Sequence, residues 1–183
     1  AAAGGHSLLM MGPPGSGKTH AICELIEQIL KRPPDGQRKR ILVCGSTYAS
    51  IDNVIDRLKK DPGVSLLKVN ADGGRHDELR LPFLNKGIRY SLGLGESEEA
   101  TKVADQIVAE SADVTCATVM GATRHPWFRF SRNPNEPMTM NPPWDYLIID
   151  ESSKTLVQEF IVPAVLAKRW IIVGDVKQLA PYV

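Results

Sequence analysis

The sequence predicts an α/β domain in which a parallel sheet lies between layers of helices. Segments with apolar residues at helical spacing alternate along the chain with short apolar runs. These short runs are continuously apolar, which is typical of strands buried on both faces of a parallel sheet. The length of 183 residues, with 43% hydrophobic and 23% charged residues, is typical of a single globular domain with a sizeable core.

The first third of the chain predicts three strands and two helices. An apolar run that ends at Gly12 suits a buried strand, and the helix after it is broken by two prolines. A second amphipathic helix carries apolar residues at spacings of three and four and ends before Pro62 and Gly63. The predicted strands are residues 6–11, 41–45 and 65–70, and the predicted helices are residues 17–30 and 51–58.

The rest of the chain continues the alternation after an interruption. Residues 71–95 are rich in glycine and charge and show no clear period. Residues 124–143 carry several prolines and aromatic residues, which predicts a long surface loop. The remaining predicted strands are residues 113–118, 146–150 and 170–175, and the remaining predicted helices are residues 100–108 and 155–167.

Five residues fall at the carboxyl ends of predicted strands. In an open parallel sheet, ligands bind at this edge. We therefore expect these positions to contribute to one site. They are Gly12, Gly45, Thr118, Asp150 and Gly174.

The composition argues against several kinds of site and partner. The formal net charge of +1 gives no bulk attraction to nucleic acid, so any such contact must come from local groups. Cys23, Cys44 and Cys116 form no CxxC pair, which indicates neither a zinc site nor a disulfide framework and is typical of a reducing compartment. No apolar run approaches membrane-spanning length. We therefore expect an intracellular protein, cytoplasmic or, in a eukaryote, nuclear, with no membrane partner.

A glycine-rich segment between the first strand and the first helix predicts a phosphate site. It matches the pattern GxxxxGK[ST] in full. Glycines allow the backbone angles that turn N–H groups inward, and the helix N-terminus adds partial positive charge. Lys18 should reach the β- and γ-phosphates, the Thr19 hydroxyl should bind Mg²⁺, and His20 is expected to pack or to cap the helix. The predicted loop is Gly12, Pro13, Pro14, Gly15, Ser16, Gly17, Lys18 and Thr19.

Two acidic residues lie at the end of the predicted strand 146–150. Asp150 is the last residue of this strand, and Glu151 follows it. Asp150 is placed to hold the shell of Mg²⁺, and Glu151 is placed to orient or deprotonate an attacking water. The alternative is a solvated acidic pair at the start of a helix. After the last strand, Asp175 and Gln178 are placed to sense a γ-phosphate, and physical reasoning leaves open the alternative of a plain turn ending at Pro181.

Five segments occur in an order and spacing typical of one family: GPPGSGKT, ILVCGSTYASIDNVIDRL, ADVTCATVMGA, LIIDESSK and VPAVLAKRWIIVGDVKQLAP. Together they resemble successive motifs of the first RecA-like domain of superfamily-one helicases. The similarity is greatest to the AAA_11/AAA_12 group of nonsense-mediated-decay-like and Dna-two-like helicases, which translocate along single-stranded nucleic acid. The resemblance implies a P-loop NTPase of RecA-like fold with a small inserted helical subdomain at about residues 72–110.

The resemblance also implies roles for the matching residues. Lys18 and Thr19 would bind ATP and Mg²⁺, and Asp150 would hold the metal. Glu151 would be the catalytic base, and Gln178 would sense the γ-phosphate and couple hydrolysis to motion. Single-stranded DNA or RNA would contact residues after the second and fourth strands, namely Ser46, Thr47, Tyr48 and Thr118.

In this family a second RecA-like domain supplies later motifs and arginine fingers, and residues 1–183 contain no counterpart of it. We therefore expect one RecA-like ATP-binding domain over residues 1–183, half of a helicase motor from a longer chain and weakly active alone. Two other classes stay open: a P-loop NTPase or kinase acting on a small molecule, and a binding module that uses ATP as a switch. The segment VGDVKQLAP favours the helicase over the kinase.

Overall fold

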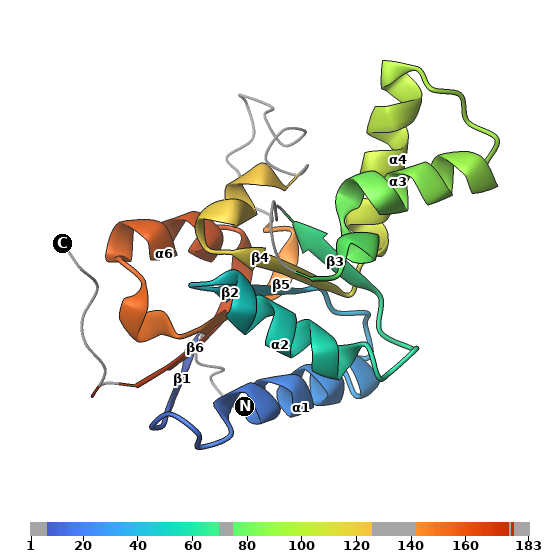
Figure 1. Ribbon diagram of the computed structural model, residues 1–183. Helices are drawn as coiled ribbons and strands as arrows, with labels where there is room; N and C mark the ends of the chain where they lie inside the picture. Colours follow the sequence, from blue (N-terminus) through green and yellow to red (C-terminus); the bar gives the residue numbers. More distant parts are fainter. Residues whose placement is uncertain (1–6, 70–74, 126–141, 176, 178–183) are drawn as a thin grey trace.

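The computed structural model describes residues 7–69, 75–125, 142–175 and 177. These residues form a six-stranded parallel sheet with helices on both faces, which confirms the predicted fold class (Figure 1). The strand order is β1-β6-β5-β2-β4-β3. The strands are β1 (Ser7–Met11), β2 (Ile41–Gly45), β3 (Leu66–Val69), β4 (Val114–Thr118), β5 (Trp144–Asp150) and β6 (Ala167–Gly174).

Helices and short 3₁₀ turns connect these strands. Two helices begin at polar caps: Thr47 Oγ1 accepts a hydrogen bond from the amide of Ser50, and Ser97 Oγ accepts one from the amide of Ala100. The helices are α1 (Lys18–Lys31), α2 (Tyr48–Leu58), α3 (Leu81–Ser91), α4 (Glu98–Ser111) and α6 (Val157–Ala164). The 3₁₀ turns are η1 (Asp77–Leu79), η2 (Met120–Arg124) and η3 (Ser152–Lys154).

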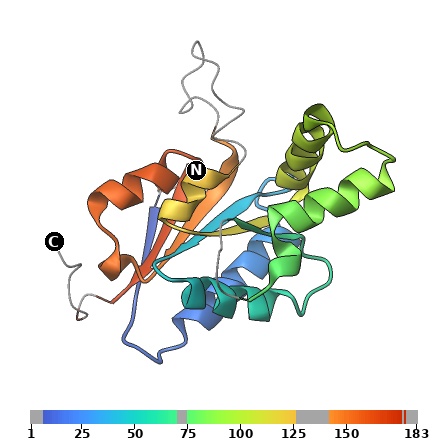
Figure 2. The ribbon, with the colours of Figure 1, turned by 45° about the horizontal axis from the view of Figure 1, so that its top comes forward.

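Two apolar cores fill the two faces of the sheet. On one face, α1 and α2 lie side by side (Figures 1 and 2), with Ile22 of α1 and Ile55 of α2 fully buried. On the other face, parts of α4, η2 and α6 pack against side chains such as Leu147 of β5. Successive strand residues alternate between the two cores, so every central strand is buried on both sides, as the continuous apolar runs predicted.

The chain between β3 and β4 contains a helix that the hydrophobic spacing did not reveal, within the range for which the family resemblance implied a helical insertion. Residues 71–95 showed no clear period, yet α3 occupies 81–91 and packs against α4 (Figure 1). Its apolar contacts come from Leu81, Leu84 and Ile88, and the buried Asn85 donates a hydrogen bond from α3 to Asp105 of α4. The aromatic side chains of Phe83 and Tyr90 are exposed. Exposed aromatic residues on the outer face mask an apolar stripe this narrow.

Two further boundaries differ from the sequence prediction. The helix expected over 155–167 is shorter, because residues 152–154 form η3 and strand β6 already begins at Ala167. Strand β5 begins at Trp144, which is 1% exposed and anchors the strand start. Most of the surface loop predicted over 124–143 lies outside the described residues.

A buried ion pair joins α2 to β3. Lys68 is 1% exposed, and its Nζ donates to Asp52 Oδ1 at 2.7 Å and to the carbonyl of Arg75. The amide of Arg75 donates in turn to Asp52 Oδ2 at 3.0 Å. Both carboxylate oxygens are therefore engaged, and the segment that enters η1 is fixed against the body of the domain.

The three cysteines are free and buried. Burial raises the pKa of Cys23 to about 11 and that of Cys116 to about 12, so neither is a reactive thiolate at neutral pH. The described helices include none that is both long and apolar enough to cross a bilayer.

Candidate active site

The strand register brings the predicted site residues to one edge of the sheet. Gly45 of β2 lies opposite Thr118 of β4 and also opposite Asp150 of β5. Met11 of β1 lies opposite Gly174 of β6. The carboxyl ends of five strands are thus level, and the residues that follow them lie side by side.

The segment after β1 forms a loop that leads directly into the N-terminus of α1. The Gly12 amide donates to the Gly174 carbonyl at 3.1 Å, which fixes the start of the loop against β6. Gly15 and Gly17 have φ values of +75° and +85°, which glycine adopts without strain. The chain therefore reaches α1 with its free amides and positive helix end at the loop.

Lys18 folds over this loop. Its Nζ donates to the carbonyl of Gly12 at 2.6 Å and to that of Pro13 at 2.9 Å. These neutral acceptors hold the ammonium at the centre of the loop. A phosphate placed there offers charged oxygens, which accept stronger hydrogen bonds than carbonyls do.

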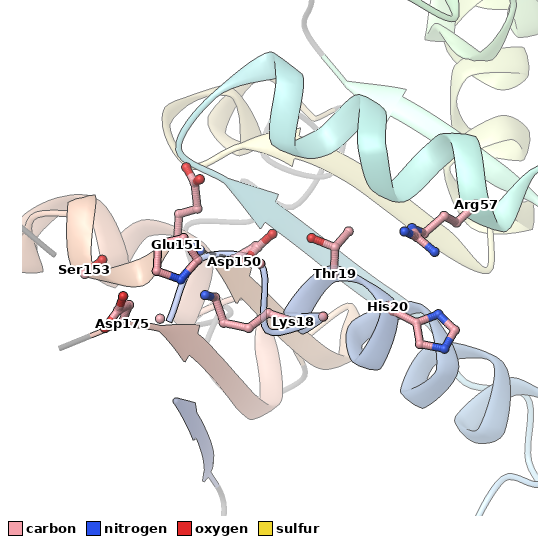
Figure 3. A pocket seen from close by; sticks show the side chains of 12 residues that line it. Lys18, Thr19, His20, Arg57, Asp150, Glu151, Ser153 and Asp175 are labelled. Carbon is pink, nitrogen blue, oxygen red and sulfur yellow. Dashed lines mark hydrogen bonds between the residues drawn. The ribbon is translucent and has the colours of Figure 1, made fainter. Parts of the chain in front are cut away.

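A cleft of about 400 Å³ opens above the loop. In Figure 3, Lys18, Thr19 and Asp150 come from α1 and β5 and lie around the same space. Its volume and its mixture of glycine, cationic and acidic residues suit a polar ligand with phosphates. The lining residues are Pro14, Gly15, Gly17, Lys18, Thr19, His20, Arg57, Asp150, Glu151, Ser153, Gly174 and Asp175.

The donors at the cleft fit a magnesium ion bound together with a nucleotide. Mg²⁺ prefers oxygen ligands and commonly uses one or two protein groups, with waters and phosphates completing its shell. Asp150 and Thr19 supply such oxygens. Ser153 lines the same cleft, and its buried Oγ has no hydrogen-bond partner in the described part of the chain. Within those same residues there is no cluster of three metal-ligating side chains that would hold an ion without a nucleotide.

The two acidic residues of the site have opposite electrostatic environments. Burial raises the pKa of Asp150, and the neighbouring Glu151 carboxylate raises it further. Burial acts in the same direction on Glu151, but hydrogen bonds from Ser46 and Lys154 outweigh it and keep the pKa of Glu151 below its usual value. Glu151 is therefore ionised at neutral pH, as a proton acceptor must be.

Glu151 lies between the cleft and a second hollow beside it. It has a left-handed backbone with φ of +56°, and its Oε2 accepts a hydrogen bond from Ser46 Oγ at 2.6 Å and an ion pair from Lys154 Nζ at 3.2 Å. Figure 3 shows its carboxylate at the tip of β2, pointing away from Lys18. The side chain thus turns from the cleft toward the residues that follow β2.

The second hollow, of about 470 Å³, lies beside the cleft. It brings together all four residues expected to contact nucleic acid, and Lys154 and Glu159 complete its polar wall. The Thr118 hydroxyl accepts a hydrogen bond from the Gly121 amide at 3.0 Å, and Tyr48 is 37% exposed. The lining residues are Ser46, Thr47, Tyr48, Thr118, Val119, Met120, Lys154, Thr155 and Glu159.

Several placements differ from the sequence analysis or add to it. Gln178 lies outside the described residues, whereas Asp175 is 6% exposed and lines the cleft. His20, expected to pack or cap, is exposed and lines the cleft. Arg57 and Ser153 were not anticipated. Arg57 is an exposed residue of α2, and it reaches the cleft because α2 packs beside α1.

Comparisons with known proteins bear on the family to which the chain belongs. A family model described as an AAA domain, AAA_11, matches residues 1–92 and 93–183. A regulator of nonsense transcripts 1 homolog from Neurospora crassa is 25% identical over 199 residues, which cover 96% of this chain and 17% of that protein. The DNA replication ATP-dependent helicase/nuclease JHS1 of Arabidopsis thaliana is 27% identical over 175 residues, covering 96% of this chain and 11% of that protein.

Solved structures agree on the fold. The structure of Arterivirus nonstructural protein 10, a helicase in complex with DNA, superposes with a TM-score of 0.50 at 16% identity. The superposition covers 95% of this chain and 30% of that one. This chain therefore spans less than a third of the length of each of these three proteins.

Proposed function

Because the chain belongs to the AAA_11 family of AAA domains, we propose that it is the ATP-binding and hydrolysing half of a superfamily-one helicase or translocase acting on single-stranded nucleic acid. The observation that carries the proposal is the adjacency of the two hollows. One is built like a nucleotide site, the other gathers Ser46, Thr47, Tyr48 and Thr118, and Glu151 lies between them.

In the proposed reaction the chain's own residues position ATP and a water molecule. Lys18 exchanges the carbonyls of its loop for the β- and γ-phosphates. Thr19 and Asp150 would hold Mg²⁺, which would neutralise charge on the phosphates when it is bound. Glu151 accepts a proton from the attacking water, and Gln178 senses the γ-phosphate, as the family resemblance implies.

The proposed partners are single-stranded DNA or RNA and a facing RecA-like domain. A facing domain would bring an arginine to the charge that develops on the γ-phosphate, and such a residue accelerates turnover by about 10³–10⁵ in other phosphate-loop enzymes. An intracellular location is part of the proposal. Three buried free cysteines support it, because they are typical of a reducing compartment.

Nucleotide titration of the wild-type chain and of Lys18→Ala tests the proposal. We expect the substitution to weaken binding of a fluorescent ATP analogue by about tenfold to more than a hundredfold, since it removes charged hydrogen bonds to phosphate. Lys31→Ala, at the far end of the same helix and paired with Glu27, is the matched control and should bind as wild type does. Equal affinity of wild type and Lys18→Ala would exclude the phosphate site.

A second measurement tests the class of motor. Phosphate release is followed with and without single-stranded oligonucleotide, in this chain and in a longer protein that includes a downstream domain. Stimulation by oligonucleotide in the longer protein supports the helicase assignment. Turnover that depends on a small hydroxylated acceptor instead would support a kinase.

A further inference from the structure

The wall between the two hollows contains a cluster of three side chains, Ser46, Glu151 and Lys154, which we name the Glu151 clamp. The clamp joins the residue after β2 to the residues after β5, because Gly45 and Asp150 are directly paired in the sheet. Ser46 and Lys154 line the second hollow, whereas Glu151 lines the nucleotide cleft. One carboxylate therefore contacts donors that belong to the neighbouring site.

The clamp holds Glu151 away from the phosphate loop. Ser46 Oγ and Lys154 Nζ both bind the same oxygen, Oε2, and the carboxylate points away from Lys18 (Figure 3). A general base must lie within hydrogen-bond reach of the water that it deprotonates, or one water removed from it. The contacts with Ser46 and Lys154 therefore keep the carboxylate of Glu151, the proposed base, turned away from the position that a γ-phosphate would take.

The donors of the clamp also suit a nucleic-acid phosphate. A serine hydroxyl has a single proton to donate, so Ser46 bonds either Glu151 or another acceptor. The Lys154 side chain is 47% exposed, which leaves it open to an anion in the second hollow.

We propose that Ser46 and Lys154 are positioning residues that restrain Glu151 until a phosphate of a bound strand takes their hydrogen bonds. The released carboxylate then turns toward the nucleotide. This inference rests on the proposed function and names a way in which strand binding controls hydrolysis. It requires that Glu151 and the strand compete for the same donors.

Competition can be measured by strand binding alone, without turnover. Fluorescence anisotropy at low salt gives the affinity for a labelled single-stranded oligonucleotide of wild type, Glu151→Gln, Lys154→Ala and the double variant. Glu151→Gln removes the negative charge that holds the two donors and should tighten binding by about three- to tenfold, the range for one ordinary hydrogen bond. In the Lys154→Ala background the gain should shrink to less than half.

A matched cycle separates competition from general charge effects. Glu98 and Lys102 form an exposed ion pair of 2.6 Å on α4, outside both hollows. Glu98→Gln and Lys102→Ala should be additive in oligonucleotide affinity. Lys154→Ala should also lower the slope of log affinity against log salt by about 0.7, the value for losing one phosphate contact on a single strand.

Phosphate release provides the second readout. Without oligonucleotide, Ser46→Ala and Lys154→Ala should release phosphate about three to ten times faster than wild type, and oligonucleotide should stimulate them less. Lys154→Arg should restore the wild-type ratio. A merely structural role would not raise the strand-free rate.

The outcomes separate the clamp from the proposed function. An additive Glu151–Lys154 cycle, absence of oligonucleotide binding, or slower strand-free release in both clamp variants would overturn the clamp. Slower strand-free release would mean that the contacts with Ser46 and Lys154 hold Glu151 in the position that it needs for hydrolysis. Failure of ATP binding would overturn the proposed function, while the anisotropy cycle would still decide whether Glu151 and the strand compete.

Discussion

Asp52→Asn tests how much the buried ion pair between α2 and β3 stabilises the domain. The substitution keeps the shape of the side chain and removes its charge, which leaves the Lys68 ammonium 1% exposed without a counter-ion. Removing one partner of a buried pair typically costs about 3–5 kcal/mol. An asparagine also offers one oxygen where Lys68 and the Arg75 amide now use two, so one of these donors loses its acceptor.

A loss of this size is a large part of the stability of the domain. The free energy of unfolding of a domain is about 5–15 kcal/mol in total, so Asp52→Asn should remove about a fifth of it or more. Urea unfolding followed by far-UV circular dichroism gives the free energy of unfolding. The double variant Asp52→Leu/Lys68→Met should recover most of the loss, because apolar residues of similar volume leave no buried charge.

The difference between wild type and variant should depend on pH. Burial acts to raise the pKa of Asp52, but hydrogen bonds from Lys68 and the Arg75 amide outweigh it, so the folded pKa lies below the usual 3.8. The stabilisation by Asp52 is therefore complete above pH 3.8 and is lost as the pH falls through the folded pKa. A single-variant cost below about 1 kcal/mol at pH 7, typical of exposed pairs, would refute this reasoning. So would a double variant as unstable as the single one.

Three further predictions concern the loop, the sheet edge and turnover. Mg²⁺ should tighten binding of a fluorescent ATP analogue, and Asp150→Asn should remove that gain; equal binding by wild type in excess EDTA would exclude this role. Gly45→Ala should destabilise the domain by about 1–3 kcal/mol in urea unfolding, because a Cβ there would lie 2.1 Å from Ser50 Oγ. Gly87→Ala, where a Cβ meets nothing within 4 Å, is its control. Residues 1–183 alone should release phosphate about 10³-fold or more slowly than a protein with a facing domain, and a coupled phosphate assay on both would detect equal rates.

The phosphate loop and the strands could be read from sequence because their signals are local. The loop needs a strand, a glycine pattern and a helix in immediate succession, and all three lie within residues 6–30. Strands buried on both faces are continuously apolar, so their existence was clear even where their ends were not. Helix α3 was missed because only a narrow stripe of it is covered, which leaves little periodicity to detect.

The contact between Ser46 and Glu151 could not be predicted from the sequence. The two residues are 105 positions apart, and they meet only because β2 lies between β4 and β5. Alternating helices and strands indicate a parallel sheet but do not specify which strands are neighbours. Arg57 reaches the nucleotide cleft for a similar reason, through the packing of α2 beside α1.

The strand that carries the phosphate loop lies at the edge of the sheet. Among the described strands β1 pairs with β6 alone, and its Leu8 and Leu9 are 50% and 60% exposed. A strand held on one side opens locally at a lower free energy than β5, which is held on both. A ligand that binds the phosphate loop only while β1 is paired with β6 stabilises this paired state by its binding free energy. A nucleotide bound in the proposed site would therefore make local opening of this edge rarer as its concentration rises.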